Sequence, residues 1–261
     1  MAAKKNTASP STEAVSDILT VTTNTLVCHV LGTTPIILNR LSEKAKHELL
    51  MPRGKKNAAE RATTFKHIPV DEFRASAHRL SDERQPTLLA IPATAFKGSI
   101  RTAALDMPGA KKAQIGRLTY VEGDYVGIYG VPKLLMSAVR SADMNKTPDI
   151  RTRVIVPEWA CIVRVTHVQP LIRAQAVANL LAAAGITVGV GDWRPEKGGG
   201  SYGQFRIVPE NDPQFLGIVK AGGRAAQVDG MDNPVAYDDE STDLLSWFEV
   251  VRKRRSLHGV A

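Results

Sequence analysis

The sequence of residues 161–185 is CIVRVTHVQPLIRAQAVANLLAAAG, and its two halves have the periodicities that decide the fold class. From Cys161 to Val168, apolar residues alternate with more polar ones, which is the period of a half-buried strand. From Pro170 to Ala184, apolar residues recur at helical spacing, and Gly185 follows where a helix would end. These residues therefore predict a strand that leads directly into an amphipathic helix.

The segments on either side continue this succession of strands and helices. Downstream, Ile186–Val190 has the composition of a buried strand, and Gln204–Val208 predicts another strand after a glycine-rich loop. Upstream, the predicted elements are a strand over Asp17–Leu31, a helix over Thr94–Leu105 with Thr94 as N-cap, and strands near Arg117–Val131 and Arg151–Val168. Helices placed between antiparallel strands indicate an α+β protein of the ferredoxin-like type.

Three parts are expected along the chain. Residues 1–16 predict a flexible polar tail, residues 17–210 the main domain, and residues 211–261 a C-terminal extension with one amphipathic helix near Asp243–Val251. An insertion over about residues 42–88 interrupts the main domain. In this region we expect a helix over Leu38–Leu50, a basic loop over residues 51–67 and a short helix over Val70–Leu80.

Composition limits the class of protein and its partners. Of the 261 residues, 43% are hydrophobic and 23% charged, as in a soluble globular protein. Lys and Arg outnumber Asp and Glu by 34 to 26, and this net charge of +8 makes polyanions plausible partners. No apolar run is long enough to span a membrane and no signal sequence is evident, so we expect a cytoplasmic protein without membrane contact.

The cysteines and histidines give no sign of a metal site, a cofactor or an enzyme. Two cysteines, Cys28 and Cys161, are too few for a disulfide framework or a Cys-rich zinc site. The six histidines lack the spacing of a metal site. A Cys–His dyad stays open, but both cysteines lie in strand-like apolar runs, where a buried thiol is the simpler interpretation. We therefore expect no cofactor, no metal and no catalytic residue.

A glycine-rich segment, GVGDWRPEKGGGSYGQF, covers residues 189–205. Its glycines offer backbone N–H groups that a phosphate backbone can approach closely. Arg194 and Lys197 add positive charge, and Trp193 and Tyr202 could stack on bases. The alternative is a flexible hairpin whose aromatic residues cover an edge of the core.

A second segment, IPATAFKGSIR, covers residues 91–101. Lys97 and Arg101 are four residues apart and share one helical face, so they can present two cations to one polyanion. The alternative is an ordinary solvated helix face.

Three motifs in order resemble those of one family, the RAMP superfamily of CRISPR-associated proteins. Residues 91–103, IPATAFKGSIRTA, resemble its I-P-x-[ST]-[ST]-[FL]-K-G-x-[IL]-R signature, and residues 189–207 resemble its glycine-rich loop. Residues 31–45, LGTTPIILNRLSEKA, resemble the start of the Cascade-type backbone subunits and of their phage or plasmid relatives. The chain departs from the pattern in being short for such a subunit.

This resemblance implies a modified RNA-recognition-motif fold and a role in antiviral defence. It implies a non-catalytic backbone subunit that holds guide RNA by its phosphates, in head-to-tail copies within a ribonucleoprotein alongside other effector subunits. Its basic contact residues match Asn39, Arg40, Lys97 and Arg101, and its loop glycines match Gly189, Gly191, Gly199, Gly200 and Gly203.

Three alternatives stay open at this stage. One is a phage or plasmid protein that binds or anneals single-stranded DNA on the same fold. Another is a guide-RNA-processing endoribonuclease, which would need a His or Tyr near the first helix or the glycine-rich loop, where Tyr202 lies. The last is a structural oligomer with incidental positive charge. For assembly, the expected contact elements are the basic loop over residues 52–67 and the tail helix over Asp243–Arg255.

Overall fold

The computed structural model describes residues 19–41, 46, 49–51, 65–140, 148–197 and 199–257. The elements in chain order are β1 (Thr22–Gly32), β2 (Ile36–Leu38), α3 (Pro69–Ala75), β3 (His78–Arg79), β4 (Leu89–Pro92), α4 (Ala93–Ala103), α5 (Lys112–Leu118), β5 (Thr119–Val121), β6 (Tyr125–Tyr129), β7 (Lys133–Arg140), β8 (Pro148–Val156), β9 (Ala160–Gln169), α6 (Ala174–Thr187), β10 (Phe205–Val208), α7 (Pro213–Ala221), α8 (Arg224–Asp232) and α9 (Asp239–Leu257).

The larger sheet confirms the predicted fold class. Its strand order is β10–β1–β9–β6–β4–β3, and every pairing along this path is antiparallel. Helix α4 lies between β1 and β6 in the chain, and α6 connects β9 to β10. This succession of elements and the central order β10–β1–β9–β6 are those of a ferredoxin-like βαββαβ unit. Strand β5 also pairs with β9, beside the start of β6.

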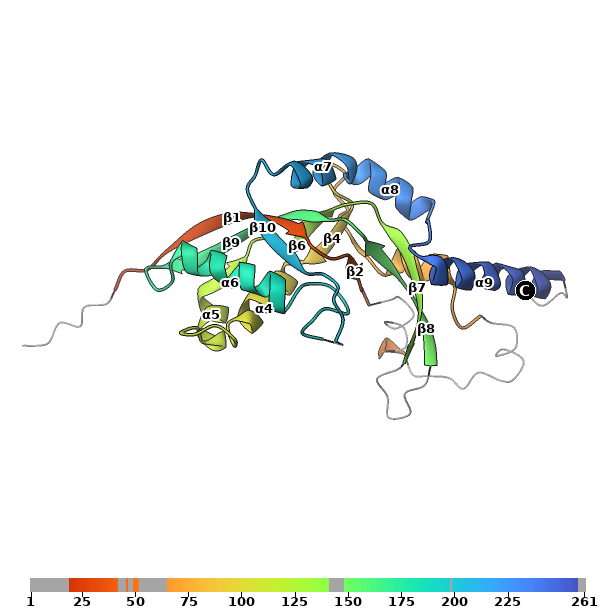
Figure 1. Cartoon of the computed structure of the whole chain (residues 1–261), viewed down its shortest axis with the longest axis horizontal. Coiled ribbons are helices and arrows are strands. Elements are labelled where there is room, and N and C mark those ends of the chain that lie inside the picture. The colour runs from red at the N-terminus through yellow and green to blue at the C-terminus, as the bar shows by residue number, and fades with distance from the viewer. Residues whose placement is uncertain are drawn as a thin grey trace, which may run out of the picture.

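The main core lies between this sheet and the helices α4 and α6. Alternation along β1 and β9 turns Cys28, Val30, Cys161 and Val163 towards it, as the sequence predicts. The ring of Phe96 on α4 packs edge-on against a β10 ring, with 5.6 Å between centroids. Figure 1 shows α4, α5 and α6 on one side of the sheet and α7 and α8 on the other.

The two thiols are structural. Both cysteines are buried and unbonded, and burial raises the pKa of Cys28 to about 11. A thiol with so high a pKa stays protonated and is a poor nucleophile at neutral pH, which argues against a Cys–His dyad.

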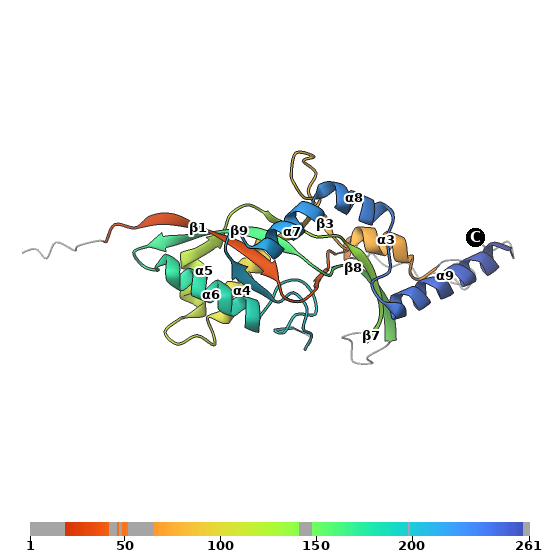
Figure 2. The same cartoon turned by 45° about the horizontal axis from the view of Figure 1, so that its top comes forward.

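A second, three-stranded sheet has the order β2–β8–β7. Buried hydroxyls fasten two helices to it. Ser76, which follows α3, accepts a hydrogen bond at its Oγ from the Val154 N–H of β8, at 2.8 Å. Ser241 of α9 accepts one from the Met136 N–H of β7, at 3.0 Å. In Figure 2, α3 lies beside β8, and α9 extends away from the body of the molecule.

The described part of the C-terminal extension, residues 211–257, contains three helices instead of the one expected. Helix α7 covers part of the sheet face opposite α4 and α6, where Phe215 and Ile218 pack on Leu31 and Ala160. On α8, the fully buried Gln227 accepts hydrogen bonds from the N–H groups of residues 88 and 89 and donates to the carbonyls of residues 128, 130 and 222. These contacts are distant in sequence, which is why local periodicity missed them.

Helix α6 is displaced from its prediction, and the strand expected after it is wrong. The helix begins at Ala174 and continues through Gly185 to Thr187. Gly185 is therefore an interior residue of the helix, and glycine is required there because a Cβ would collide with the backbone of Phe205. Gly189, at φ +72°, follows the actual end, and its N–H donates to Ala184 O at 2.8 Å. Residues 188–190 are therefore a turn, not a strand.

Other local predictions need smaller corrections. Thr94 lies in the first turn of α4 and Pro92 is the N-cap, so Thr94 does not cap the helix. The expected helix over Leu38–Leu50 does not start at Leu38, which belongs to β2. The short helix over Val70–Leu80 ends earlier, at Ala75, and β3 follows. Strand β7 was not predicted. The tail over residues 1–16 and the loop over 52–64 lie outside the described residues.

The longest helix, α9, carries both apolar and basic residues. Phe248 is buried and meets the ring of Phe65 at 5.3 Å, whereas Trp247 is 62% exposed. Within the described part of the chain, no helix combines the length and apolar character needed to cross a bilayer.

Candidate functional site

A cleft of about 530 Å³ brings together several of the predicted contact residues. It lies between the end of β2, the strands β3 and β4, the helices α4 and α5, and the glycine-rich loop. Its charged and polar lining includes Asn39, His78, Thr94, Arg101, Thr102, Lys112, Asp192, Arg194, Glu196 and Lys197. Five separate parts of the chain therefore contribute polar groups to one concave surface.

Helix α4 presents one face to the cleft and the other to the core. Thr94, Gly98 and Arg101 share the cleft face, while Phe96 and Ile100 are buried on the opposite side. Open space faces Gly98, since a Cβ there would meet no atom within 4 Å. A ligand backbone can thus approach the middle of this helix closely.

Arg101 is held in place by its neighbour helix. Its side chain passes over Gly116 of α5, where a Cβ would lie 2.8 Å from the Arg101 Cδ atom. Any larger residue at position 116 would displace the arginine stem. Lys97, which sequence reasoning pairs with Arg101, is half-buried and does not line the cleft.

Asn39 and Arg40 follow β2 but have different surroundings. Asn39 lines the cleft, and its amide donates to Asp192 Oδ2 at 3.1 Å. The Arg40 side chain does not line it, and the Arg40 N–H donates to Ser76 O at 2.7 Å. Burial lowers the pKa of His78, and the positive charge of Arg40 lowers it further.

The glycine-rich loop is folded on itself and fastened to β2. The Asp192 N–H donates to Ile37 O at 2.9 Å, and the Gly203 N–H donates to Pro35 O at 2.8 Å. Arg153 of β8 forms an ion pair of 2.6 Å with the Asp192 carboxylate, the group that Asn39 also contacts. These bonds fix the wall of the cleft.

The loop glycines chiefly allow this folding. Positive φ angles occur at Gly189, Gly191, Gly199 and Gly203. A Cβ at Gly203 would collide with the carbonyl of Val190, and one at Gly200 with that of Trp193. Gly191 lines the cleft, whereas the N–H groups of Gly189 and Gly203 are used inside the protein.

The two aromatic residues of the loop stack on each other. The rings of Trp193 and Tyr202 lie 6.2 Å apart and nearly parallel, at 8°. Tyr202 also packs on the buried Ile37, and neither ring lines the cleft. Trp193 is 37% exposed and Tyr202 is half-buried, so the stacked pair is partly accessible but lies outside the cleft.

The cations of the cleft differ in their partners. Arg194 forms an ion pair with Glu196 at 2.7 Å and donates to Gly191 O at 2.9 Å. Throughout the described ranges, by contrast, Arg101, Lys112 and Lys197 have no ion pair. Three uncompensated positive charges from α4, α5 and the loop thus face one cavity.

Lys112 and His78 were missed by sequence reasoning. Lys112 is the first residue of α5, where a positive side chain is disfavoured by the helix dipole. The helix that Lys112 begins was not predicted, so this position could not be recognised from the sequence. His78 lies in a two-residue strand, which is too short for periodicity to reveal.

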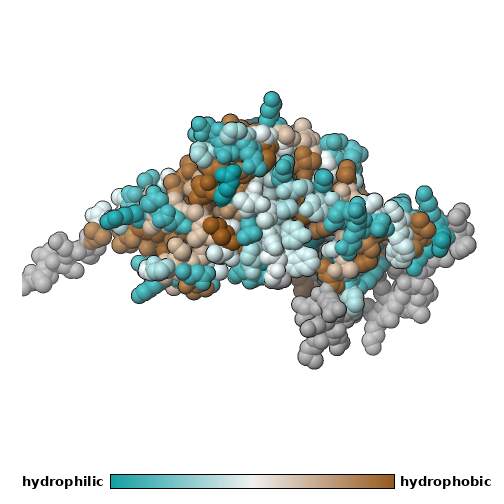
Figure 3. Space-filling view, viewed as in Figure 1, coloured by the Kyte–Doolittle hydropathy of each residue, from teal (hydrophilic) through white to brown (hydrophobic). Residues whose placement is uncertain are grey.

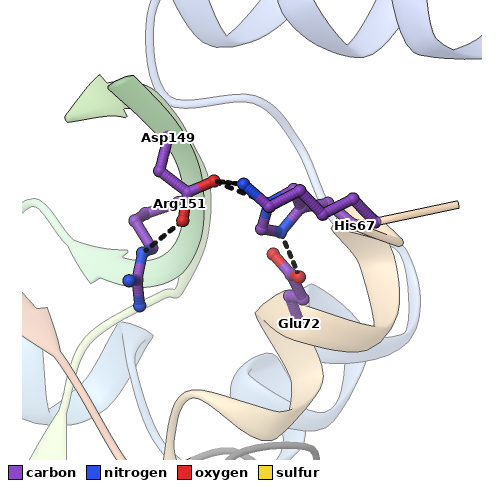
Figure 4. Close-up of polar contacts among 5 residues, drawn as sticks. His67, Glu72, Asp149 and Arg151 are labelled. Atoms are coloured by element: carbon purple, nitrogen blue, oxygen red, sulfur yellow. Dashed lines mark hydrogen bonds and ion pairs between the residues drawn. The ribbon is translucent and has the colours of Figure 1, made fainter. Parts of the chain in front are cut away.

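A second polar cluster lies away from this cleft, where the residues before α3 meet β8 (Figure 4). His67 contacts Glu72 through Nδ1 at 2.7 Å and Asp149 through Nε2 at 2.9 Å. Asp149 also pairs with Lys66 and Arg151. Within the described residues, no group of three or more His, Cys, Asp or Glu side chains is arranged to hold a metal ion.

Comparisons with known proteins give remote structural matches. No protein-family model matches the chain, and no curated protein does. Cmr6 from Pyrococcus furiosus is similar at a TM-score of 0.35 and 10% identity, over 72% of this chain and 98% of that one. A chain of the Type III-B Cmr-beta complex bound to cognate target RNA is similar at a TM-score of 0.34 and 12% identity, over 72% of this chain and 59% of that chain. At these TM-scores the likeness carries no conclusion about function.

Proposed function

We propose that this chain binds single-stranded nucleic acid by its phosphates, and that the cleft beside α4 is the binding site. The observation that carries the proposal is a set of three cations around one cavity, Arg101, Lys112 and Lys197, none of which forms an ion pair with any residue that the structure describes. Phosphates are the ligands that such a set attracts, and each neutralised phosphate releases counterions. The net charge of +8 acts in the same direction.

We further propose that the strand is a guide RNA and that the chain is a subunit of a CRISPR-type ribonucleoprotein. The three ordered motifs that resemble the RAMP superfamily support this finer assignment, and each lies beside the cleft or in its walls. Single-stranded DNA would offer the same phosphates, so matched RNA and DNA strands belong in every binding experiment. RNA of defined length that copurifies with the natural protein would support the guide role.

We propose binding without cleavage. Two carboxylates line the cleft, and both are engaged, Asp192 by Arg153 and Glu196 by Arg194. His78 therefore has no free carboxylate beside it in the lining to serve as its acid–base partner. Incubation of RNA with the purified protein should leave the strand intact. Cleavage that is lost in His78→Ala would overturn this part of the proposal.

The test of the main proposal compares two triple variants in salt titrations with a fluorescent single strand. Replacing Arg101, Lys112 and Lys197 by Ala should weaken binding on the order of 100-fold at low salt and flatten the slope of log K against log salt by about 2. The control replaces three exposed cations outside the cleft by Ala, namely Arg117, Arg173 and Lys220. Equal losses in both variants would leave only general charge, and the cleft proposal would be wrong.

A further inference from the structure

A groove of about 540 Å³ lies on the sheet face opposite α4 and α6. Its floor is formed by Tyr125, Gly127 and Tyr129 of β6 and by Ile162 and Arg164 of β9, and the loop over residues 80–87 covers it. The alternation of β6 and β9 turns the four side chains of this floor away from the main core.

The loop that covers the groove is anchored on the C-terminal extension. Arg224 of α8 donates to the carbonyls of Leu80, Asp82 and Thr87, at 3.0 to 3.2 Å. Gln227, one turn later, accepts from the N–H groups that follow this loop. These hydrogen bonds fix the loop in place before any ligand arrives, which reduces the ordering cost of binding.

The groove and the cation-lined cleft meet at the edge of the sheet. Pro92 of the cleft pairs in register with Tyr125 of the groove, and Ala90 pairs with Gly127. The ring of His78, which lines the cleft, lies 5.2 Å from the ring of Tyr125. One pair of neighbouring strands therefore separates the two sites, so a single bound strand can reach both.

The chemistry of the groove suits a base and not a phosphate. Tyr125 is 46% exposed and Ile162 37%, so a flat apolar surface faces solvent. Asp82 and Asp124 line the groove, and carboxylates repel phosphate but accept hydrogen bonds from base amino groups. Arg164 has no ion pair within the described residues, and its guanidinium can stack on a base.

We propose that this groove takes a nucleobase of the strand whose phosphates occupy the cleft, with Tyr125 as the stacking surface. The inference rests on the proposed function and adds a base contact to it. Because two carboxylates line the groove and can only accept hydrogen bonds, bases that carry an amino group should bind better than uracil. Asp124 is the acceptor to test, since Asp82 already accepts from the Arg84 N–H at 3.1 Å.

The experiment measures the affinity of the full chain for oligo(A), oligo(C), oligo(U) and an abasic strand of equal length. Tyr125→Ala should lose about 5-fold to 100-fold on oligo(A) and oligo(C), as expected for one lost stacking contact, and nothing on the abasic strand. Tyr125→Phe keeps the ring and should bind like the wild type. Asp124→Asn should reduce the preference for oligo(C) over oligo(U).

The outcomes separate this inference from the proposed function. If the cleft triple variant loses affinity but Tyr125→Ala binds all four strands like the wild type, the groove proposal is wrong and the cleft proposal stands. The same conclusion would follow if the groove proved to hold a protein segment, because strand affinity would again not depend on Tyr125. If the wild type binds none of the strands, both proposals fail.

Discussion

The cleft beside α4 and the cluster around His67 contain similar charged side chains, but these differ in how far they are paired within the protein. In the cluster, Lys66 and Arg151 both pair with Asp149, and His67 bridges Asp149 to Glu72. In the cleft, the carboxylates are engaged by Arg153 and Arg194, and three further cations face the cavity without an ion pair to any described residue. Charge satisfied within the protein stabilises the fold, whereas charge left without a partner is available to a ligand. Substitutions in the cluster should therefore lower stability and leave affinity for a strand unchanged, whereas substitutions of the cleft cations should change affinity.

The largest effect of this kind is expected from Asp149→Asn. The substitution weakens the contact with the half-buried His67 and the contacts with the exposed Lys66 and Arg151, and should lower the free energy of unfolding by about 1–3 kcal/mol. Urea unfolding measures this loss, and affinity for a single strand should not change. Asp106→Asn, at an exposed carboxylate after α4, is the control and should change neither quantity. Reduced affinity at unchanged stability would show that the cluster, and not only the cleft, contacts the ligand.

The same carboxylate should give an acid-dependent stability. Burial alone would raise the pKa of Asp149, but hydrogen bonds from Lys66 and His67 outweigh it and hold the pKa below its ordinary value. A carboxyl with a lowered pKa contributes stability that is complete above its unfolded pKa, about 3.9, and is lost as pH falls through the folded value. The gap in unfolding free energy between wild type and Asp149→Asn should therefore close below about pH 4. A gap that stays constant through this range would remove Asp149 as the titrating group.

The sequence predicted those parts of the fold that depend on local period. Alternation in residues 161–168 identified β9, and the helical stripe after it identified α6. The end of α6 was misplaced because two glycines lie near it, and either could have been the one that follows the helix. Gly185 is required by close packing on Phe205, and Gly189 by the left-handed turn. Only the neighbouring strand distinguishes these two roles.

The site was predicted in part for the same reason. Arg101 and Lys197 were identified from local motifs and both line the cleft. Lys112 was not, because no motif joins it to them, and folding alone brings α5 beside α4. Sequence reasoning did not single out the tyrosines of β6, which line the groove, because their exposure depends on which part of the sheet face α7 leaves uncovered.

The smallest expected effect comes from the Arg194–Glu196 ion pair, which lies in the cleft but is paired like the charges of the His67 cluster. Arg194 was predicted as a phosphate contact, but its guanidinium is engaged by Glu196 through both Nε and Nη2. Glu196→Gln removes the opposing charge and frees Arg194 for a phosphate. Because an ion pair of this exposure is worth at most about 1 kcal/mol, affinity should rise roughly 2-fold to 5-fold.

The salt dependence makes this small change measurable. A fourth available cation should steepen the slope of log K against log salt by about 0.7 for a single strand. Glu210→Gln, at an exposed carboxylate outside the cleft, makes the same change in net charge and should leave the slope as it is. If both variants gain affinity equally, the gain reflects net charge alone. If Glu196→Gln instead loses affinity, the ion pair is needed to shape the loop, and Arg194 then belongs with the structural charges of the His67 cluster.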